Sequence, residues 1–267
     1  EFSMDLASII GFVVCLGMII FGIVTGDEGF AAITHFLHGP SFIITVGGTV
    51  SCVLAMNSIQ DFISGLKSFL LVFKVPALET PQIIKKIIDL SNIARKEGLL
   101  SLEEAAADLD DEFLKKGILL IVDGTDPDLV RGILETELTC IEDRHKKRIE
   151  FWMNVAAMGP AWGMIGTLIG LILMLQSLTD ASTIGPNMST ALITTLYGSM
   201  LANWIATPVA TKLKTNSDGE SMVKEIMIEG LLSIQAGENP RVIEEKLKSF
   251  LAPAQRAAAS EEEGGEQ

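Results

Sequence analysis

The stretch 151–211 constrains the fold of this chain more than any other, because it holds a single charged residue. Asp180 divides it into two uncharged runs, 151–179 and 181–211. Each run exceeds the roughly 20 residues that a helix needs to cross about 30 Å of hydrocarbon. We therefore predict two membrane-spanning helices joined by a short outer loop at Asp180.

Two more uncharged runs lie near the N-terminus, at 6–26 and 41–60. Their lengths predict two further spans, joined by an outer loop at 27–40. All 20 Lys and Arg residues fall within 67–148 and 212–256, and the expected outer loops contain none. Because basic segments are retained in the cytoplasm, we predict four spans with both termini on the cytoplasmic side.

The predicted fold class is an all-α membrane protein. Four transmembrane helices carry a helical cytoplasmic domain that is inserted between spans two and three, and Met4 is the expected native start. The mean hydropathy of +0.41 agrees with a membrane protein. The expected regions are 4–60 with transmembrane helices one and two, 61–150 with the cytoplasmic helical domain, 151–211 with transmembrane helices three and four, 212–252 with cytoplasmic C-terminal helices, and 253–267 with a disordered acidic tail.

The cytoplasmic segments carry local signals for helix ends. A capping residue followed by proline marks a helix start, and glycine marks a stop. The starts are Thr80-Pro81, Asp126-Pro127 and Asn239-Pro240, and the stops are Gly98, Gly124 and Gly237. Ser101 and Glu104 have the spacing of a capping box, which would begin another helix. The helix that starts at Pro127 keeps its apolar period far enough to enter the membrane unbroken as span three.

The third and fourth spans contain residues that lipid-facing helices rarely use. Small residues recur at helical spacing, at Gly159, Gly163, Gly166 and Gly170. This pattern favours close helix packing over a ligand role. Pro160 and Pro208 each remove a backbone hydrogen bond inside a span. The sequence leaves open whether these prolines are inert kinks or moving parts.

Three threonines and one asparagine give these spans polar oxygens. They are Thr167, Thr194, Thr195 and Asn203. Membrane threonines usually donate to carbonyls of their own helix, and that structural interpretation stays open. Hydroxyl oxygens also suit a partly dehydrated sodium ion, whereas proton relays use an acid or histidine within the membrane, and neither run contains one. If ions move here, the carboxylate must come from another chain.

Other classes of function find little support in the sequence. There is no HExxH, GxSxG, Walker A or dinucleotide-binding motif, so we do not expect an enzyme. A formal net charge of −14 argues against nucleic acid as a partner. No cofactor is expected, and the only metal considered is a transient sodium ion at Thr167 and Thr195.

Four blocks of sequence resemble one known family. GPAWGMIGTLIGL at 159–171 and IGPNMSTALITTLYGSMLAN at 184–203 lie in the expected spans, while ARKEGLLSLEEA at 94–105 and ENPRVIEEKL at 238–247 lie in the cytoplasmic segments. Together with the four-span order, they resemble the A subunit of the bacterial flagellar stator, the MotA/PomA family within the MotA/TolQ/ExbB superfamily. The resemblance extends over nearly the whole chain.

The resemblance implies a function, partners and a location. Such a subunit forms a homopentamer in the bacterial inner membrane around two single-span B subunits of the MotB/PomB type. The B subunits supply the essential ion-carrying Asp and the peptidoglycan anchor. Ion flow through the complex drives motility as torque on the rotor protein FliG, and no nucleic acid is involved.

Individual residues take implied roles from the family positions that they match. The implied rotor-contact residues are Arg95, Lys96, Glu103 and Glu104. Pro160 and Pro208 match the two prolines that couple ion flow to movement. The missing intramembrane carboxylate is thereby explained, since the B subunit supplies it.

The threonines bear on the coupling ion. Thr167 together with Thr194 and Thr195 resembles the sodium-driven members, so sodium is favoured over the proton. His38 departs from this pattern, because sodium-type relatives carry an acid just before the outer-loop proline. The runner-up is an ExbB/TolQ-like energy-transducing subunit, which has three spans arranged differently. A passive membrane scaffold is the third candidate, and it would not need membrane prolines and hydroxyls.

Overall fold

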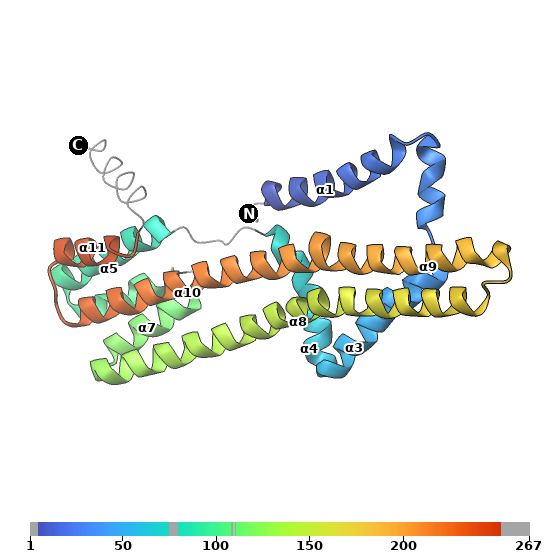
Figure 1. Cartoon of the computed structure of the whole chain (residues 1–267). Coiled ribbons are helices and arrows are strands. Elements are labelled where there is room, and N and C mark those ends of the chain that lie inside the picture. Colours follow the sequence, from blue (N-terminus) through green and yellow to red (C-terminus); the bar gives the residue numbers. More distant parts are fainter. Residues whose placement is uncertain (1–4, 75–79, 108, 110, 252–267) are drawn as a thin grey trace. The chain divides into compact units, whose positions relative to one another are not determined.

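Figure 1 shows the computed structural model of the chain. It describes residues 5–74, 80–107, 109 and 111–251. Every regular element within these ranges is a helix, which confirms the predicted all-α class. The expected start at Met4 and the expected disordered tail at 253–267 lie outside the described residues.

The chain forms two compact units. The first unit comprises Glu1–Val75 with His145–Thr215, and the second comprises Pro76–Arg144 with Asn216–Gln267. The predicted boundaries at 61 and 150 therefore differ from those of the units. Helix α8 (Pro127–Gln176) contributes to both units without a break, as predicted for the helix that begins at Pro127.

The first unit contains the uncharged runs. Its other elements are α1 (Leu6–Val24), η1 (Gly29–Phe36), α2 (Gly39–Phe42), the π-helical η2 (Ile43–Gly47), α3 (Gly48–Met56), α4 (Ile59–Ser68), η3 (Phe69–Phe73), α9 (Ala181–Met200), the π-helical η5 (Leu201–Ala206) and the start of α10 (Thr207–Gln235). Three helical stretches of the described chain are long and apolar enough to cross a membrane: α1, Gly39–Met56 and α8. The fourth uncharged run forms α9, η5 and the start of α10 as one continuous helical stretch.

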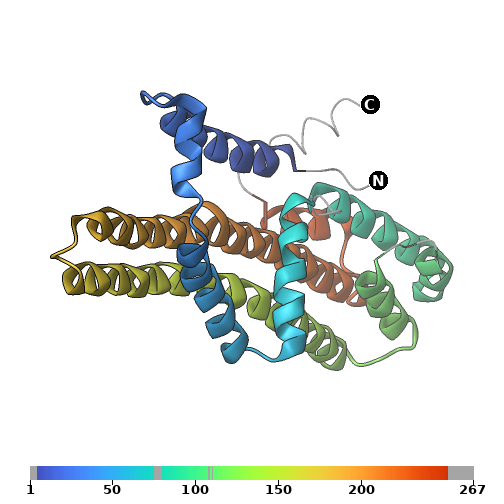
Figure 2. The same ribbon diagram turned by 90° about the vertical axis from the view of Figure 1, so that its right-hand side faces the viewer.

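The helix of the second uncharged run ends earlier than predicted. The prediction placed its end at Gln60, whereas α3 stops at Met56 and Asn57 is extended, with φ −126° and ψ 157°. Ser58 then caps α4, because its hydroxyl accepts the N–H of Asp61 at 3.1 Å. Figure 2 shows α3 and α4 meeting at a sharp bend. The sequence stays uncharged through this bend, so composition did not reveal it.

Helix α4 packs against the start of the uncharged part of α8. The indole N–H of Trp152 lies 3.1 Å from the carbonyl oxygen of Gly65 and 3.0 Å from Oγ of Ser68. A Cβ on Gly65 would lie 2.4 Å from the ring of Phe151, so a larger residue would force the two helices apart. This packing explains why 61–75 belongs to the first unit although the sequence predicted it in the cytoplasmic domain.

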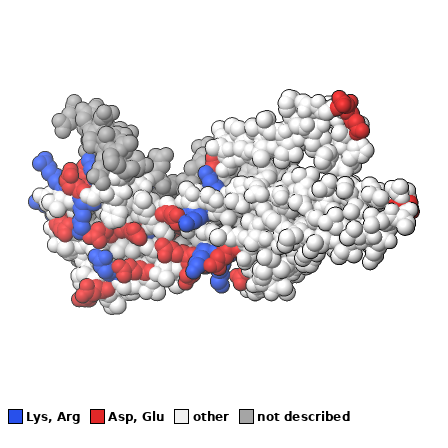
Figure 3. Space-filling model, in the orientation of Figure 1, with Lys and Arg blue, Asp and Glu red and all other residues white. Residues whose placement is uncertain are grey.

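The surface of the first unit is largely uncharged and apolar. In Figure 3 most of its visible surface is white, and acidic side chains mark the outer ends of its loops. Large apolar side chains are exposed on α1, α8 and α9, among them Ile10, Met164 and Leu192 at 58%, 62% and 65%. A soluble monomer rarely shows so large an apolar surface, so lipid or another protein is expected to cover it.

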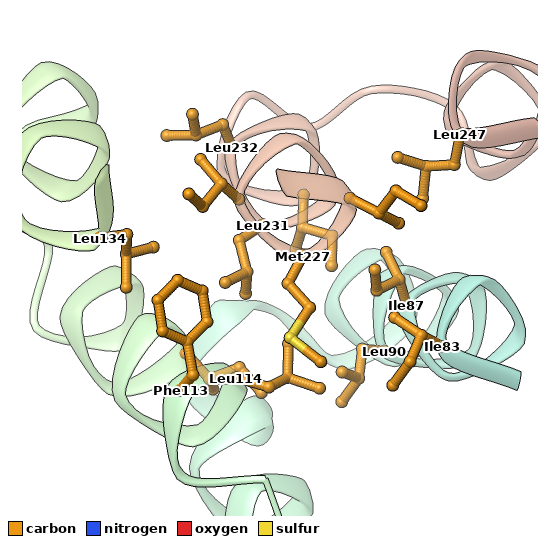
Figure 4. Close-up of a cluster of buried hydrophobic side chains, with 14 of the residues drawn as sticks. Ile83, Ile87, Leu90, Phe113, Leu114, Leu134, Met227, Leu231, Leu232 and Leu247 are labelled. Atoms are coloured by element: carbon orange, nitrogen blue, oxygen red, sulfur yellow. The ribbon is translucent and has the colours of Figure 1, made fainter. Parts of the chain in front are cut away.

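The second unit is a helical domain with its own core. Its elements are α5 (Thr80–Glu97), η4 (Leu99–Ser101), α6 (Leu102–Ala107), α7 (Glu112–Val122), the first part of α8, the last part of α10 and α11 (Pro240–Lys248). Figure 4 shows side chains from α5, α7, α8, α10 and α11 meeting in one cluster. Ile83, Leu114, Leu134, Leu231 and Leu247 in this cluster are completely buried. Burial of this apolar surface is the main stabilising contribution to the unit.

Most of the predicted helix ends in this unit are confirmed. Helix α5 ends directly before Gly98, whose φ of 91° favours glycine, and α8 and α11 begin at Pro127 and Pro240. The predicted helix start after Ser101 is confirmed, since α6 begins at Leu102, but the predicted capping box does not form. The hydroxyl of Ser101 donates to the carbonyl of Gly98 at 2.6 Å, and no hydrogen bond joins it to Glu104 in the described chain. The turn between α5 and α6 is a 3₁₀ segment, and the hydroxyl of Ser101 forms a hydrogen bond within this turn.

Candidate functional site

Helices α8 and α9 approach each other along the stripe of small residues on α8. Figures 1 and 2 both show the two helices side by side. A Cβ added at Gly163 would lie 2.9 Å from the carbonyl oxygen of Thr194, and one added at Gly198 would lie 2.5 Å from the carbonyl oxygen of Gly159. A larger residue would push the two backbones apart, so the predicted packing role of these glycines is confirmed.

This close approach brings Thr167 and Thr195 together. Their Oγ1 atoms are 2.5 Å apart, and we call these two residues the hydroxyl pair. Oγ1 of Thr167 is also 3.1 Å from the carbonyl oxygen of Gly163 and 3.0 Å from that of Ala191. Oγ1 of Thr195 lies 3.3 Å from the same Ala191 carbonyl. Thr195 is exposed and Thr167 is half-buried, so the pair is a polar spot on an apolar surface.

Thr194 does not join the hydroxyl pair. It is completely buried, and its hydroxyl lies 3.1 Å and 2.9 Å from the carbonyl oxygens of Thr190 and Ala191. Its side chain fills the space beside Gly166, where an added Cβ would lie 2.4 Å away. Its own carbonyl accepts the hydroxyl of Thr45, on η2, at 3.3 Å. Thr194 therefore holds three helical segments together.

The two prolines lie in different local geometries. Both are exposed. Pro160 sits inside α8 and has no N–H to donate to the carbonyl of Ala156, four residues earlier. Pro208 follows η5, where the N–H of Thr207 bonds to the carbonyl of Ala202, five residues earlier. This wider turn lies directly before Pro208, where the proline ring would otherwise crowd the preceding turn.

Charged groups border the α8–α9 pair. Asp180 caps α9, and its carboxylate accepts the hydroxyl of Ser182 at 2.6 Å and the N–H of the same residue at 3.0 Å. These two hydrogen bonds lower the pKa of Asp180. Asp5, which caps α1, accepts a hydrogen bond from Lys212, and this bond lowers the pKa of Asp5 to about 2. Both carboxylates therefore stay ionised at neutral pH.

The hydroxyl pair offers oxygen ligands without a titrating group. Each hydroxyl has one proton to donate and two lone pairs to accept with, and the nearby Ala191 carbonyl adds a further acceptor. Oxygens of this kind can replace part of the hydration shell of a cation. Threonine does not ionise near neutral pH, so the pair by itself cannot relay protons in the way that an intramembrane carboxylate does.

The predicted rotor-contact residues lie around one turn of the second unit. Arg95 and Lys96 are in the last turn of α5, and Glu103 and Glu104 are in the first turn of α6. All four are exposed, and none joins an ion pair within the described chain. Basic residues at a helix C-terminus and acidic residues at an N-terminus are also favoured by the helix dipoles.

Sequence reasoning missed the residues that anchor α9 to the segment before α2. Tyr197 donates its hydroxyl to the carbonyl of Phe36 and accepts the N–H of His38 at 3.1 Å. His38 in turn caps α2, with its Nδ1 2.7 Å from Oγ of Ser41. Tyr197 is the only tyrosine in the sequence and lies in an uncharged run. A buried phenol needs a hydrogen-bond partner, and that need was the available signal.

Comparisons with known proteins agree on one family. Residues 105–250 match the model of the MotA/TolQ/ExbB proton channel family. The chain is 42% identical to motility protein A of Treponema pallidum, over 95% of this chain and 96% of that protein. It is 37% identical to the chemotaxis protein PomA of Vibrio alginolyticus, over 97% of this chain and all of that protein. Its structure is similar to the flagellar MotAB stator complex from Bacillus subtilis, with a TM-score of 0.87 and 30% identity over 95% of this chain and 99% of that one.

Proposed function

We propose, from the premise that this chain belongs to the MotA/TolQ/ExbB proton channel family and to its motility protein A branch, that it is the A-type stator subunit of a bacterial flagellar motor. The chain is not an enzyme. With a B-type subunit it forms an ion channel whose ion flow produces torque on the rotor. The observation that carries this proposal is the hydroxyl pair, which offers cation ligands within the runs 151–179 and 181–211, where the sequence has no carboxylate.

The proposed topology has four spans with both termini in the cytoplasm. Three helices meet the length and hydropathy of a span, and the fourth is α9 with η5, which carries no charged residue. The absence of Lys and Arg from the expected outer loops supports this orientation. The second unit and the end of the chain would then lie in the cytoplasm of a cell whose inner membrane holds the spans.

We propose sodium as the coupling ion in preference to the proton. When a cation binds the oxygens of Thr167 and Thr195, both hydroxyl protons can point to the carbonyls of Gly163 and Ala191. The hydrogen bond between the two hydroxyls is then exchanged for one to a carbonyl, and both carbonyls already lie within reach of a hydroxyl. A transferred proton would need only a carboxylate and would gain little from this arrangement.

The missing carboxylate defines the partner. A MotB/PomB-like subunit would place its Asp beside the hydroxyl pair and would anchor the complex to peptidoglycan. The exposed apolar side chains around the pair support an assembly in which other chains cover this face. A homopentamer of this chain around the B subunits is the proposed arrangement.

The proposed torque contact is formed by Arg95, Lys96, Glu103 and Glu104. Their charges have no intramolecular ion pair among the described residues, so they are available to the rotor protein FliG. Exposed charges of both signs side by side give orientation and specificity to a contact more than they give affinity.

Two other functions make different demands on the same residues. An ExbB/TolQ-like subunit is within the matched family, but the relatives named above are motility proteins or chemotaxis proteins. A passive scaffold would tolerate the loss of Thr167, because a scaffold only needs its helices to pack. Sodium-dependent swimming therefore separates the three functions.

The test is motility in sodium-free and sodium-containing buffer, with the cognate B subunit present. We expect the wild type to swim only with sodium, and Thr167→Ala to lose most sodium-dependent rotation while still assembling with the B subunit. Thr190→Ala is the matched control, because within the described residues the hydroxyl of Thr190 bonds only to the Pro186 carbonyl of its own helix. Equal swimming of the wild type without sodium, together with normal swimming of Thr167→Ala, would show that the motor uses protons and that the threonines are structural.

A further inference from the structure

A hollow of about 540 Å³ lies on the first unit beside α4. Its wall is formed by Gln60, Ile63, Ser64, Lys67 and Ser68 of α4, by Leu71 of η3 and by Arg148 of α8. The volume falls within the range of about 300–1,000 Å³ that small-molecule sites have. The proposed function does not use this hollow.

Two cations that join no ion pair within the described part of the chain line the hollow. Arg148 is half-buried, and its Nε donates to Oγ of Ser64 at 3.3 Å, which fixes one edge of the guanidinium. Its other N–H groups and the ammonium of Lys67 join no ion pair among the described residues. The neighbouring Lys147 differs, because its Nζ lies 4.0 Å from the carboxylate of Asp61. The hollow therefore has a positive charge that no acidic group of the described chain neutralises.

An apolar stripe runs along α4 and η3 next to the hollow. Ile59, Ile63, Leu66 and Leu70 recur at helical spacing, and they are exposed by 72%, 46%, 50% and 64%. Lys67 follows the stripe on the same helix, so α4 is apolar on one side and basic beside it. A helix of this pattern is typical of a membrane–water interface. Trp152, whose ring also favours that interface, donates to Ser68, which itself lines the hollow.

We propose that this hollow binds the headgroup of an anionic phospholipid from the cytoplasmic leaflet. The phosphate accepts hydrogen bonds from Lys67 and from the guanidinium of Arg148, and the acyl chains lie along the apolar stripe. The inference rests on the proposed function, because that function places α4 at the cytoplasmic surface of the membrane. Charge complementarity selects an anionic headgroup over a zwitterionic one.

The apolar stripe argues for a lipid as the occupant. Free phosphate would satisfy the two cations but would leave the stripe uncovered. A second copy of this chain would cover the stripe but would have to bring an acidic group to Lys67 and Arg148. A lipid with an anionic headgroup satisfies both features with one molecule.

The test uses the full chain purified with its B subunit and measures lipid retention by native mass spectrometry. The probes are phosphatidylglycerol and phosphatidylcholine with the same acyl chains. We expect phosphatidylglycerol to be retained preferentially, and each of Lys67→Gln and Arg148→Gln to weaken its binding about fivefold, which corresponds to roughly 1 kcal/mol per basic residue. Lys147→Gln is the matched control and changes retention less than about twofold, because Asp61 already neutralises it.

Three results would overturn the inference. Unchanged retention in Lys67→Gln would do so, and this variant is safe to interpret because Lys67 is exposed and its ammonium makes no hydrogen bond within the described chain. Displacement of the lipid by inorganic phosphate at equal concentration would indicate a phosphate site. Efficient cross-linking of Gln60→Cys between copies, unaffected by added lipid, would show that a second chain covers the hollow.

The readout is independent of motor function. If lipid retention fails while sodium-dependent swimming is normal, only the lipid site is wrong. If sodium dependence fails while retention follows the charge variants, the lipid site stands and the proposed coupling ion is wrong.

Discussion

Gly198→Ala should separate α9 from α8 at the point where Pro160 lies. The added Cβ would lie 2.5 Å from the carbonyl oxygen of Gly159, 3.0 Å from its carbonyl carbon and 3.2 Å from Cα of Pro160. All three are backbone atoms, so no side chain can rotate away to relieve the contact. The two helices must therefore move apart by roughly 0.5–1 Å before ordinary van der Waals distances are restored.

The size of the effect follows from two opposing contributions. Overpacking of this kind destabilises a core by about 1–3 kcal/mol. Replacing a helical glycine by alanine stabilises the helix by up to about 1 kcal/mol, which partly hides the steric cost. Gly17→Ala cancels this second contribution, because Gly17 lies inside helix α1 of the same unit and its added Cβ meets nothing within 4 Å. The difference in unfolding free energy between the two variants is thus expected to be about 1–3 kcal/mol.

The assay is unfolding of the full chain by SDS titration in mixed micelles, followed by tryptophan fluorescence. All three tryptophans, Trp152, Trp162 and Trp204, lie in the first unit, so the signal reports on the helices concerned. Gly198→Ala should unfold at a lower SDS fraction than Gly17→Ala. If the two variants unfold together, the backbone contact at Gly159 does not limit the approach of α8 and α9, and the packing argument is refuted.

The remaining predictions concern the second unit. Glu229 accepts a hydrogen bond from Lys246, and this bond lowers the pKa of Glu229. The interaction therefore stabilises the folded state at pH values above the ordinary glutamate pKa. Its contribution is lost as the pH falls through the lowered pKa. Glu229→Gln should accordingly lower stability at pH 7 by less than about 1 kcal/mol and should weaken the dependence on acid pH, measured by urea unfolding of the full chain between pH 7 and pH 3; an unchanged acid dependence would contradict the argument. Single neutralisation of Arg95 or Glu103 should reduce torque only partly, because exposed pairs contribute about 0–1 kcal/mol each. Reversal of both charges should stop motility and be rescued by reversing the matching rotor charges, whereas full motility in the double reversal would make these residues an ordinary solvated surface.

Helix ends were predictable where the signal is local. A proline at the first helical position and a glycine at the C-terminal cap act through their own backbone, so Pro127, Pro240 and Gly98 were placed correctly. The capping box at Ser101 does not form, because both the hydroxyl and the backbone N–H of Ser101 donate to the carbonyl of Gly98 within the 3₁₀ turn. The prediction missed the bend at Asn57, because a residue can adopt an extended backbone without a charged residue or a proline nearby.

The candidate site could be predicted only in part. The spacing of the α8 glycines predicted a packed face, since that property belongs to one helix. The contact between Thr167 and Thr195 depends on the register of two helices, which sequence spacing does not set. Thr195 and Thr194 are neighbours in sequence, yet only the first faces Thr167, while the second is buried beside Gly166. The transient sodium ion was predicted at Thr167 and Thr195, with Thr194 grouped with them in the ion pathway, and spacing along the chain could not show that Thr194 is buried.

The two prolines illustrate why the exposed face of α8 and α9 requires a protein or water environment. Pro208 is preceded by a π-helical turn, in which the N–H of Thr207 bonds to the carbonyl of Ala202 five residues earlier. The helix before Pro208 is therefore already widened. Pro160 has no such turn before it, since α8 remains α-helical throughout, and the carbonyl of Ala156 loses its bond from residue 160. In hydrocarbon an unsatisfied carbonyl costs several kcal/mol. A lipid-facing position for Pro160 would therefore be unfavourable, whereas a position beside a partner helix or a hydrated ion pathway would satisfy the carbonyl. The hydroxyl of Thr167 lies two turns further along the same side of α8. The same environment would therefore satisfy both the Ala156 carbonyl and this hydroxyl. The proposed B-subunit contact would then lie on the face that carries Pro160 and Thr167.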